Sequence, residues 1–252
     1  MNEPALRTEN LTVAYGSTLA LDHVDAVIPA GTSTALVGPN GSGKSTFLRA
    51  VAGLVAPLAG SIAVPARDTD GGVALVPQGT VVDPALPLSV TETVRIARYK
   101  RTGLAGRFRR ADREAAESAI DRVDLTHLAS RQLGELSGGQ RQRALVAQGL
   151  AQGGELLLLD EPLTGLDLGS QERIWSIVAE ERARGRTVIV STHDLGDARR
   201  CDLVLLVATK LVALGTPDEV LTPAVLGEAY GSRIISLGES SMLLDDPHHH
   251  DH

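Results

Sequence analysis

Cysteine and aromatic residues are both scarce in this sequence. Cys201 is the single cysteine among 252 residues, so no disulfide can form within the chain, which fits a reducing compartment. We expect this thiol to fill space in the core rather than to react. Aromatic residues make up only 2% of the chain, so the core has to be built from Leu, Val, Ile and Ala. Such a core is typical of a parallel sheet covered by helices on both faces.

Long hydrophobic runs and an excess of positive charge are also missing. The run that could suggest a membrane span, residues 203–208, stops at Thr209 and Lys210, far short of the roughly 20 residues needed. The first residues show no basic-then-apolar pattern, so we expect no secretory signal. We therefore expect a soluble chain, held at any membrane by another polypeptide. The formal charge of −7 argues against a nucleic-acid partner.

The most informative segment present is a G-x-x-x-x-G-K-S motif at residues 38–45, between an apolar run and a helical pattern. Its glycines let successive N–H groups point at an anion, and the following helix adds its positive end. Lys44 would reach the β- and γ-phosphates of ATP, and the Ser45 hydroxyl would ligate Mg²⁺. The residues expected to surround the nucleotide here are Gly38, Pro39, Asn40, Gly41, Ser42, Gly43, Lys44, Ser45 and Thr46.

Short apolar runs alternate with helical patterns along the chain, which predicts an α/β fold, here a P-loop NTPase core with a mainly parallel sheet. Polar residues follow three of the predicted strands. Because parallel sheets bind ligands beyond the carboxyl ends of their strands, one pocket could gather these residues with the phosphate loop. The predicted strands are residues 32–37, 73–76, 156–159 and 187–190, and the polar residues are Gln78, Asp160, Glu161 and His193.

Two acids follow the four-leucine strand directly. Asp160, at the strand tip, is placed to hold Mg²⁺, because an acid there completes the oxygen ligands around the metal. Glu161, one residue further on, could polarise a water that attacks the γ-phosphate. The alternative is a pair of surface acids, which would not explain the phosphate loop upstream.

Two parts of the chain differ from this core. Residues 11–15 and 26–28 are short alternating runs that predict an antiparallel flap beside the main sheet. Between residues 89 and 150 no strand is expected, and residues 91–101 and 112–123 have the pattern of amphipathic helices. We therefore predict one ATPase domain over residues 1–252. Its parts are the core with the flap (1–88 and 151–225), a helical subdomain (89–150) and a C-terminal extension (226–252).

Basic residues gather around the linker between the two predicted helices. Such a cluster is usually a solvated face. The alternative is contact with the acidic surface of a membrane or of a membrane partner. The cluster consists of Arg98, Lys100, Arg101, Arg107, Arg109, Arg110 and Arg113.

A second anion-seeking helix start lies at Ser137, Gly138, Gly139 and Gln140, which we call the signature segment. Its hydroxyl and its backbone N–H groups stand before the helical pattern of residues 141–151. A capped helix start would explain Ser137 but not the two glycines. The signature helix belongs to the helical subdomain, so we do not expect it to fold over the phosphate loop of its own chain.

With these motifs in this order, the sequence resembles the nucleotide-binding subunits of ATP-binding cassette (ABC) transporters over about residues 6–225. The resemblance implies that Tyr15 stacks on adenine and that Gln78 contacts Mg²⁺ and senses the membrane partner. It implies that Glu161 is the catalytic glutamate and that His193 contacts the γ-phosphate. Lys44 and Gln78 join these two as the expected catalytic residues.

The same resemblance implies a homodimer. Ser137, Gly138, Gly139 and Gln140 would complete the ATP site of a second copy, and Asp167 lies in the loop that links the two subunits. ATP binding would close this head-to-tail pair, and hydrolysis would reopen it. The span from Gly60 to Gln78 is shorter than is usual in the family, which puts the flap in doubt.

Within the family, the chain resembles subunits for zinc, manganese and iron-chelate uptake, through residues 76–78, 87–99 and 160–167. The resemblance implies a position on the cytoplasmic face of the membrane, an integral permease partner and, indirectly, an extracytoplasmic metal-binding protein. The histidine-rich tail favours zinc, because neutral imidazoles bind zinc well. The alternative is a tail without function or a tag remnant. The tail histidines are His248, His249, His250 and His252.

Two other functions compete with metal import. A cassette ATPase that moves no solute would act in DNA repair or translation. Repair ATPases of this family need a long coiled coil before the signature segment, and only about sixty residues separate it from Gln78, too few for a long heptad array. Translation factors carry two cassettes in one chain, and this chain has one. Alternatively, the tail would serve as a metal buffer or sensor independent of ATP.

Overall fold

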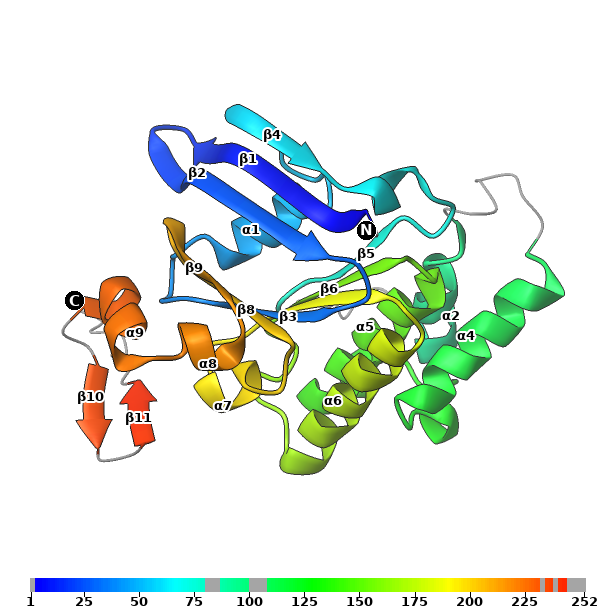
Figure 1. Cartoon of the computed structure of the whole chain (residues 1–252). Helices are drawn as coiled ribbons and strands as arrows, with labels where there is room; N and C mark the ends of the chain where they lie inside the picture. The colour runs from blue at the N-terminus through cyan, green and yellow to red at the C-terminus, as the bar shows by residue number, and fades with distance from the viewer. Residues whose placement is uncertain (1–2, 80–86, 100–107, 232–233, 238–239, 244–252) are drawn as a thin grey trace.

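A six-stranded sheet forms the centre of the molecule in the computed structural model, which describes residues 3–79, 87–99, 108–231, 234–237 and 240–243 (Figure 1). The strand order is β5-β6-β7-β3-β8-β9. The first five strands in that order pair in parallel, and β9 runs antiparallel to β8. The predicted mainly parallel sheet is confirmed. Its strands are β3 (Ser33–Val37), β5 (Val73–Val76), β6 (Leu156–Asp160), β7 (Thr187–Ser191), β8 (Leu203–Ala208) and β9 (Lys210–Gly215).

The central strands are covered on both faces. All residues of β3, β6 and β7 are buried, as expected for a parallel sheet between two layers. Alternate side chains enter two separate hydrophobic clusters. Leu156 and Leu158 pack with the flap and with helix α1 (Lys44–Val51), whereas Leu157 and Leu159 pack with the helices on the opposite face.

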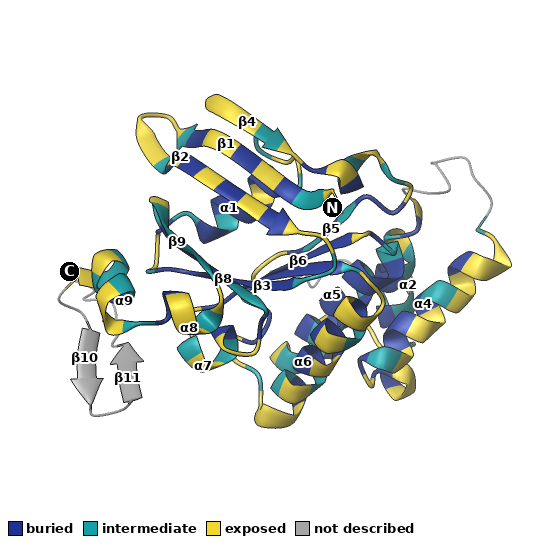
Figure 2. Cartoon of the chain, viewed as in Figure 1, coloured by how far each residue is buried: buried dark blue, intermediate teal, exposed yellow. Residues whose placement is uncertain are grey.

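The antiparallel flap covers one face of the sheet, as predicted, despite the short span from Gly60 to Gln78. Its order is β2-β1-β4, and α1 lies between it and the main sheet (Figure 1). β1 and β2 extend well beyond the predicted runs of residues 11–15 and 26–28. Buried and exposed residues alternate along most of their length (Figure 2). Gly16 makes the turn with φ +60°. The strands are β1 (Pro4–Tyr15), β2 (Thr18–Pro29) and β4 (Ala59–Ala63), followed by the 3₁₀ turn η1 (Pro65–Asp68).

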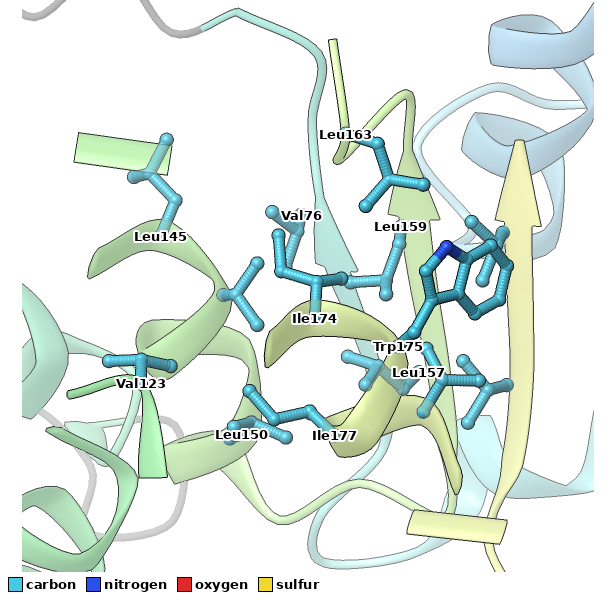
Figure 3. Close-up of a cluster of buried hydrophobic side chains, with 14 of the residues drawn as sticks. Val76, Val123, Leu145, Leu150, Leu157, Leu159, Leu163, Ile174, Trp175 and Ile177 are labelled. Carbon is cyan, nitrogen blue, oxygen red and sulfur yellow. The ribbon is translucent and has the colours of Figure 1, made fainter. Parts of the chain in front are cut away.

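Helices cover the other face. α5 (Gly138–Gln152) and α6 (Leu168–Ala183) lie under the sheet, and α2 (Val90–Ile96) and α4 (Arg110–Arg122) pack on α5 at one end (Figure 1). Figure 3 shows side chains of α5 and α6 meeting those of β5 and β6 in one cluster, with Val123, from the segment predicted as the helical subdomain (89–150), at its edge. Hydrophobic packing is therefore continuous from this segment to the sheet.

Short elements complete the chain. Thr216 is the N-cap of α8 and forms a capping box with Glu219. None of the helices in the described ranges combines the length and the apolar character needed to cross a membrane. The remaining elements are η2 (Thr126–Leu128), η3 (Leu133–Glu135), α7 (Leu195–Ala198), α8 (Pro217–Val220), α9 (Pro223–Tyr230), β10 (Ile234–Leu237) and β11 (Ser240–Leu243).

Cys201 lies in the core, where it is 5% exposed. Burial raises the pKa of its thiol to about 12, so the thiolate that reacts with oxidants or metals is scarce at neutral pH. The expectation of a space-filling cysteine agrees with this environment.

The prediction that the basic cluster is a solvated face is wrong for Arg98, because this residue is buried. Its guanidinium donates to Asp112 Oδ1 at 2.8 and 3.0 Å and to the carbonyl oxygen of Ala151 at 2.9 Å. These bonds tie the turn that follows α2 to α4 and to the last turn of α5, and they compensate a charge that would be costly to bury alone. Arg110 is exposed beside Glu114, as a solvated face requires. Lys100, Arg101 and Arg107 lie outside the described residues.

Candidate active site

The phosphate loop joins β3 to α1 at the carboxyl end of a central strand. Two of its glycines are required by their surroundings. A Cβ atom on Gly38 would strike the carbonyl oxygen of Val207, and one on Gly43 would strike that of Ala20. Gly43 also has φ +100°, a conformation that L side chains rarely adopt. The loop therefore lies directly against β8 and β2.

The N-terminus of α1 presents its backbone donors toward the loop. Gly43 is its N-cap, no side chain caps the helix, and its first turn contains no acid. The buried hydroxyl of Ser42 has no hydrogen-bond partner within the part of the chain that the structure describes. An orphaned buried hydroxyl beside an uncapped helix start fits a bound anion, which would satisfy both.

Lys44 brings a positive charge to the same place. Its side chain is almost fully buried, and its Nζ donates to the carbonyl oxygens of Gly38 at 2.8 Å and Pro39 at 3.1 Å. The ammonium is therefore already positioned against the loop. A phosphate bound by the loop would meet this charge without having to draw a long side chain out of solvent.

A cleft of about 460 Å³ opens at the loop. Tyr15 reaches it from the end of β1, and Gln78, Glu161 and His193 reach it from beyond β5, β6 and β7. Because these three strands run parallel and side by side, their carboxyl ends meet at one edge of the sheet. The residues that line the cleft are Tyr15, Ala20, Asn40, Gly41, Ser42, Gly43, Lys44, Ser45, Thr46, Gln78, Glu161 and His193.

The predicted site residues are thus largely brought together. Tyr15, the stacking candidate, is 48% exposed at the cleft, and His193 is exposed there as well. Ala20 of the flap also lines the cleft and was missed from the sequence, because an alanine in an alternating strand gives no signal. Asp160 lies one residue behind Glu161 and is only 3% exposed.

The Glu161 carboxylate accepts hydrogen bonds from two side chains. Gln78 Nε2 donates to its Oε2 at 2.7 Å, and Thr164 Oγ1 donates to the same oxygen at 3.3 Å. Its backbone is in the left-handed region, with φ +45°. The sequence suggested that Gln78 and Glu161 share a pocket but not that they touch, and Thr164 carried no signal of its own.

The oxygen donors near the loop fit a magnesium ion. The Ser45 hydroxyl, the Gln78 amide oxygen and the Asp160 carboxylate are all hard ligands of the kind that Mg²⁺ takes. Ser45 and Gln78 line the cleft, and Asp160 ends the strand from which Glu161 enters it. No nitrogen- or sulfur-rich set is needed for this metal.

The signature segment does not contribute to this cleft, as far as the described residues define it. Ser137 is the exposed N-cap of α5, and it forms a capping box with Gln140. Gln140 N donates to Ser137 Oγ at 3.2 Å, and Ser137 N donates to Gln140 Oε1 at 3.0 Å. A Cβ atom on Gly138 would meet nothing within 4 Å, so the surface here is open. This position agrees with our expectation that the segment does not fold over its own phosphate loop.

Asp167 begins α6 as its N-cap. Its carboxylate accepts hydrogen bonds from Ser170 N at 2.9 Å and Ser170 Oγ at 3.0 Å, and these bonds lower the pKa of that carboxyl. The preceding Leu166 lies against Gly139, at 3.3 Å from where a Cβ of that glycine would be. The loop that carries Asp167 therefore touches the signature helix at its start.

A smaller cavity of about 180 Å³ adjoins Glu161 and His193. Asp197 lines it and accepts a hydrogen bond from Trp175 Nε1 at 3.0 Å. Burial raises the pKa of the Asp197 carboxyl, and the nearby Asp194 adds to the effect. The hydrogen bond from Trp175 ties α7, which follows His193, to α6. Nothing in the local sequence around Trp175 or Asp197 predicts this contact.

Comparison with known proteins relates this arrangement to one family. The family profile described as ABC transporter matches residues 21–164. The chain is 36% identical to the manganese transport system ATP-binding protein MntB of Bacillus subtilis, over 91% of this chain and 93% of that one. It is 37% identical to YfeB of Yersinia pestis, described as a chelated iron transport system membrane protein, over 96% and 84% respectively.

Solved structures give the same relation. A metal-chelate type ABC transporter in an inward-facing conformation is similar with a TM-score of 0.81 and 29% identity, over 95% of this chain and 96% of that one. The ATP-binding cassette MJ0796, solved as a dimer bound to ADP and phosphate, has a TM-score of 0.74 and 26% identity, over 84% and 98%.

Proposed function

The chain belongs to the ABC transporter family as an ATP-binding subunit that hydrolyses ATP to power transport, and we propose that it drives import of a divalent transition metal. The observation that carries the ATPase part of this function is the cleft that gathers the phosphate loop, Gln78, Glu161 and His193 from separate strands. Relatives named for manganese and chelated-iron transport support metal as the cargo.

In the proposed reaction, the protein mainly positions ATP and neutralises charge. The uncapped start of α1 and Lys44 hold the phosphates, and Tyr15 stacks on the adenine. Ser45, Asp160 and Gln78 would hold Mg²⁺, which would supply positive charge to neutralise the phosphates when it is bound. Glu161 polarises the attacking water, and His193 contacts the γ-phosphate. Gln78 donates a hydrogen bond to the Glu161 carboxylate. This bond has to break, or leave the other carboxylate oxygen available, before Glu161 can accept a hydrogen bond from that water.

We further propose that two copies act as a pair. The signature segment is exposed, self-capped and outside the cleft of its own chain. Placed over the cleft of a second copy, its N–H groups and the Ser137 hydroxyl would complete the anion site there. ATP would then hold the two copies together, and cleavage of its γ-phosphate would let them separate. This assembly would act on the cytoplasmic face of the membrane, below a permease that receives metal from an extracytoplasmic binding protein.

Manganese is the first cargo to test, because relatives named for it are prominent. Zinc is the second, supported by the tail histidines at positions 248, 249, 250 and 252, which lie outside the described residues. Within the described ranges, no group of three or more His, Cys, Asp and Glu side chains could hold a metal ion.

The test is metal uptake by the complex of this chain with its permease and binding protein in liposomes. With ATP inside, we expect manganese to accumulate faster than zinc or iron. Glu161→Gln should abolish uptake and phosphate release while ATP still binds. Glu117→Gln, the same change on the exposed side of α4, serves as the matched control and should behave as wild type. Phosphate release by Glu161→Gln near the wild-type rate would contradict the assignment of the base.

The cargo is decided by the same measurement. Faster zinc uptake, lost when residues 245–252 are removed, would move the assignment to zinc and give the tail a role. Zinc uptake that survives the deletion would leave the tail without function. Absence of uptake of all three metals, with active ATP hydrolysis, would overturn metal import.

A further inference from the structure

Ser191 is a fully buried hydroxyl directly behind the catalytic acids. It is the last residue of β7, 0% exposed, and it stands opposite Asp160 in the pairing of β7 with β6. Its Oγ donates to Asp160 Oδ1 at 2.7 Å and accepts from the backbone N–H of Glu161 at 2.8 Å. One hydroxyl therefore contacts both acids of the proposed site.

The bond to the Glu161 backbone fixes an unfavourable conformation. Glu161 has φ +45°, and residues other than glycine adopt that region only when the surroundings impose it. The Glu161 N–H is the first backbone donor beyond the buried end of β6, and Ser191 Oγ accepts its hydrogen bond. Without that acceptor, Glu161 could relax to an extended backbone, which would aim its carboxylate away from Gln78 and the cleft.

The bond to Asp160 fixes the other acid. Asp160 is 3% exposed, and a buried carboxylate needs donors to remain charged and in one orientation. The Ser191 hydroxyl donates its hydrogen bond to Oδ1 of Asp160. The orientation of this carboxylate is therefore set by strand β7 and not by solvent. A carboxylate held this way presents the same oxygen to a metal at each turnover.

We propose that Ser191 is a positioning residue for ATP hydrolysis, which sets the carboxylate of Asp160 and the backbone of Glu161 at the same time. The inference rests on the roles proposed above for those two acids. It assigns a function to a hydroxyl that lines the smaller cavity and does not touch the cleft at the phosphate loop. Its two effects are separable, because one concerns magnesium and the other concerns the attacking water.

The test compares Ser191→Ala with Thr34→Val in the assembled transporter. Thr34 is a suitable control because its buried hydroxyl, on the neighbouring strand β3, has no hydrogen-bond partner among the described residues. Three quantities are measured: the maximal rate of ATP hydrolysis, the Mg²⁺ concentration for half-maximal rate, and the affinity for a fluorescent ATP analogue in excess EDTA.

For Ser191→Ala we expect about a tenfold lower maximal rate and about a tenfold higher Mg²⁺ requirement, as found when a residue behind a metal ligand is removed. The affinity in EDTA should stay within about twofold of wild type, because the phosphate loop is untouched. Thr34→Val should change none of the three. A Ser191→Ala variant with an unchanged Mg²⁺ requirement would overturn the inference, whatever its stability.

Two further variants keep the test decisive. If Ser191→Ala does not fold, Ser191→Cys keeps the volume but weakens the hydrogen bonds, and its Mg²⁺ requirement must still rise. In the Glu161→Gln background, Ser191→Ala should still raise the Mg²⁺ concentration needed to retain ATP, because that effect acts through Asp160. If Glu161→Gln hydrolyses ATP normally, the proposed base is wrong. If it is inactive while Ser191→Ala behaves as wild type, the inference about Ser191 alone fails.

Discussion

Two helix starts in this chain are suited to an anion, and they are built in opposite ways. At α1, no side chain caps the helix, a buried hydroxyl lacks a partner in the described structure, and Lys44 lies against the loop. At α5, Ser137 and Gln140 satisfy each other in a capping box on an exposed surface. Neither first turn contains an acid.

The difference indicates what each end can bind alone. The start of α1 has polar groups that the chain leaves for a ligand, so a single copy can bind nucleotide there. The start of α5 is self-sufficient, and its capping bonds can be exchanged for a phosphate only when another surface brings one. We infer that the first site is preorganised and that the second acts only in assembly.

The largest expected effect comes from removing the charge at α1. Lys44→Ala should lower ATP hydrolysis by at least about a hundredfold, because the charge that meets the phosphates is lost in a buried site. Steady-state phosphate release measures it. Lys210→Ala, which removes an exposed ammonium paired with Asp22, is the control. Equal activity of the two variants would remove the basis for calling α1 the preorganised site.

A mixing experiment tests whether the start of α5 acts on a second copy. Ser137→Arg should abolish turnover of the pair, whereas Ser130→Arg, at another exposed serine, should not. In an equal mixture of Lys44→Ala and Ser137→Arg chains, half of the pairs are mixed, and each mixed pair keeps one intact site.

The mixture should therefore regain up to about a quarter of wild-type phosphate release if the two sites work independently. Continued inactivity, with mixed pairs demonstrated by cross-linking, would show that the nucleotide site is not shared in this way.

Opposite effects on stability and binding are expected from two serine variants. Ser137→Ala should lower the free energy of unfolding by about 1 kcal/mol, the usual loss for an N-cap, and leave ATP binding to a single copy unchanged. Ser42→Ala removes a hydroxyl without a described partner, so stability should hold while ATP affinity falls. Urea unfolding and nucleotide titration measure these quantities. Reversed results would invert the comparison of the two helix starts.

The smallest effect concerns a third helix start, where Asp167 caps α6. The pKa of Asp167 is lowered in the folded chain by its bonds to Ser170. Its charge therefore stabilises the fold above the unfolded pKa near 3.8, and the contribution is lost as the pH falls through the folded value. Asp167→Asn should lower the melting temperature slightly at pH 7 and have no effect once the aspartate is protonated in acid. A difference in melting temperature between Asp167→Asn and wild type that does not change with pH would show that the cap stabilises α6 through its geometry and not through its charge.

The polar residues at the strand ends could be predicted because their surroundings in the sequence are distinctive. Glu161 follows four leucines and His193 follows a β-branched strand, so the rule for parallel sheets places both at one edge. The flap could be predicted from alternation alone, although β4 could not, since its five residues are mostly exposed and small.

Arg98 and Ser191 show where sequence reasoning failed. Arg98 stands in a run of basic residues, and nothing local distinguishes it from its exposed neighbours. Its burial depends on Asp112 and on a carbonyl of α5, which lie 14 and 53 residues away. Ser191 looks like a strand-end polar residue, and its contacts depend on the register of β7 against β6.

The sequence by itself determined the order of the motifs, the parallel sheet that they require and the loop that binds phosphate, because each depends on residues adjacent in the chain. Only the tertiary structure decided which hydroxyls and charges touch one another. Those contacts arise where separate strands and helices meet, and their distances are set by strand register and helix packing, which no short stretch of sequence encodes.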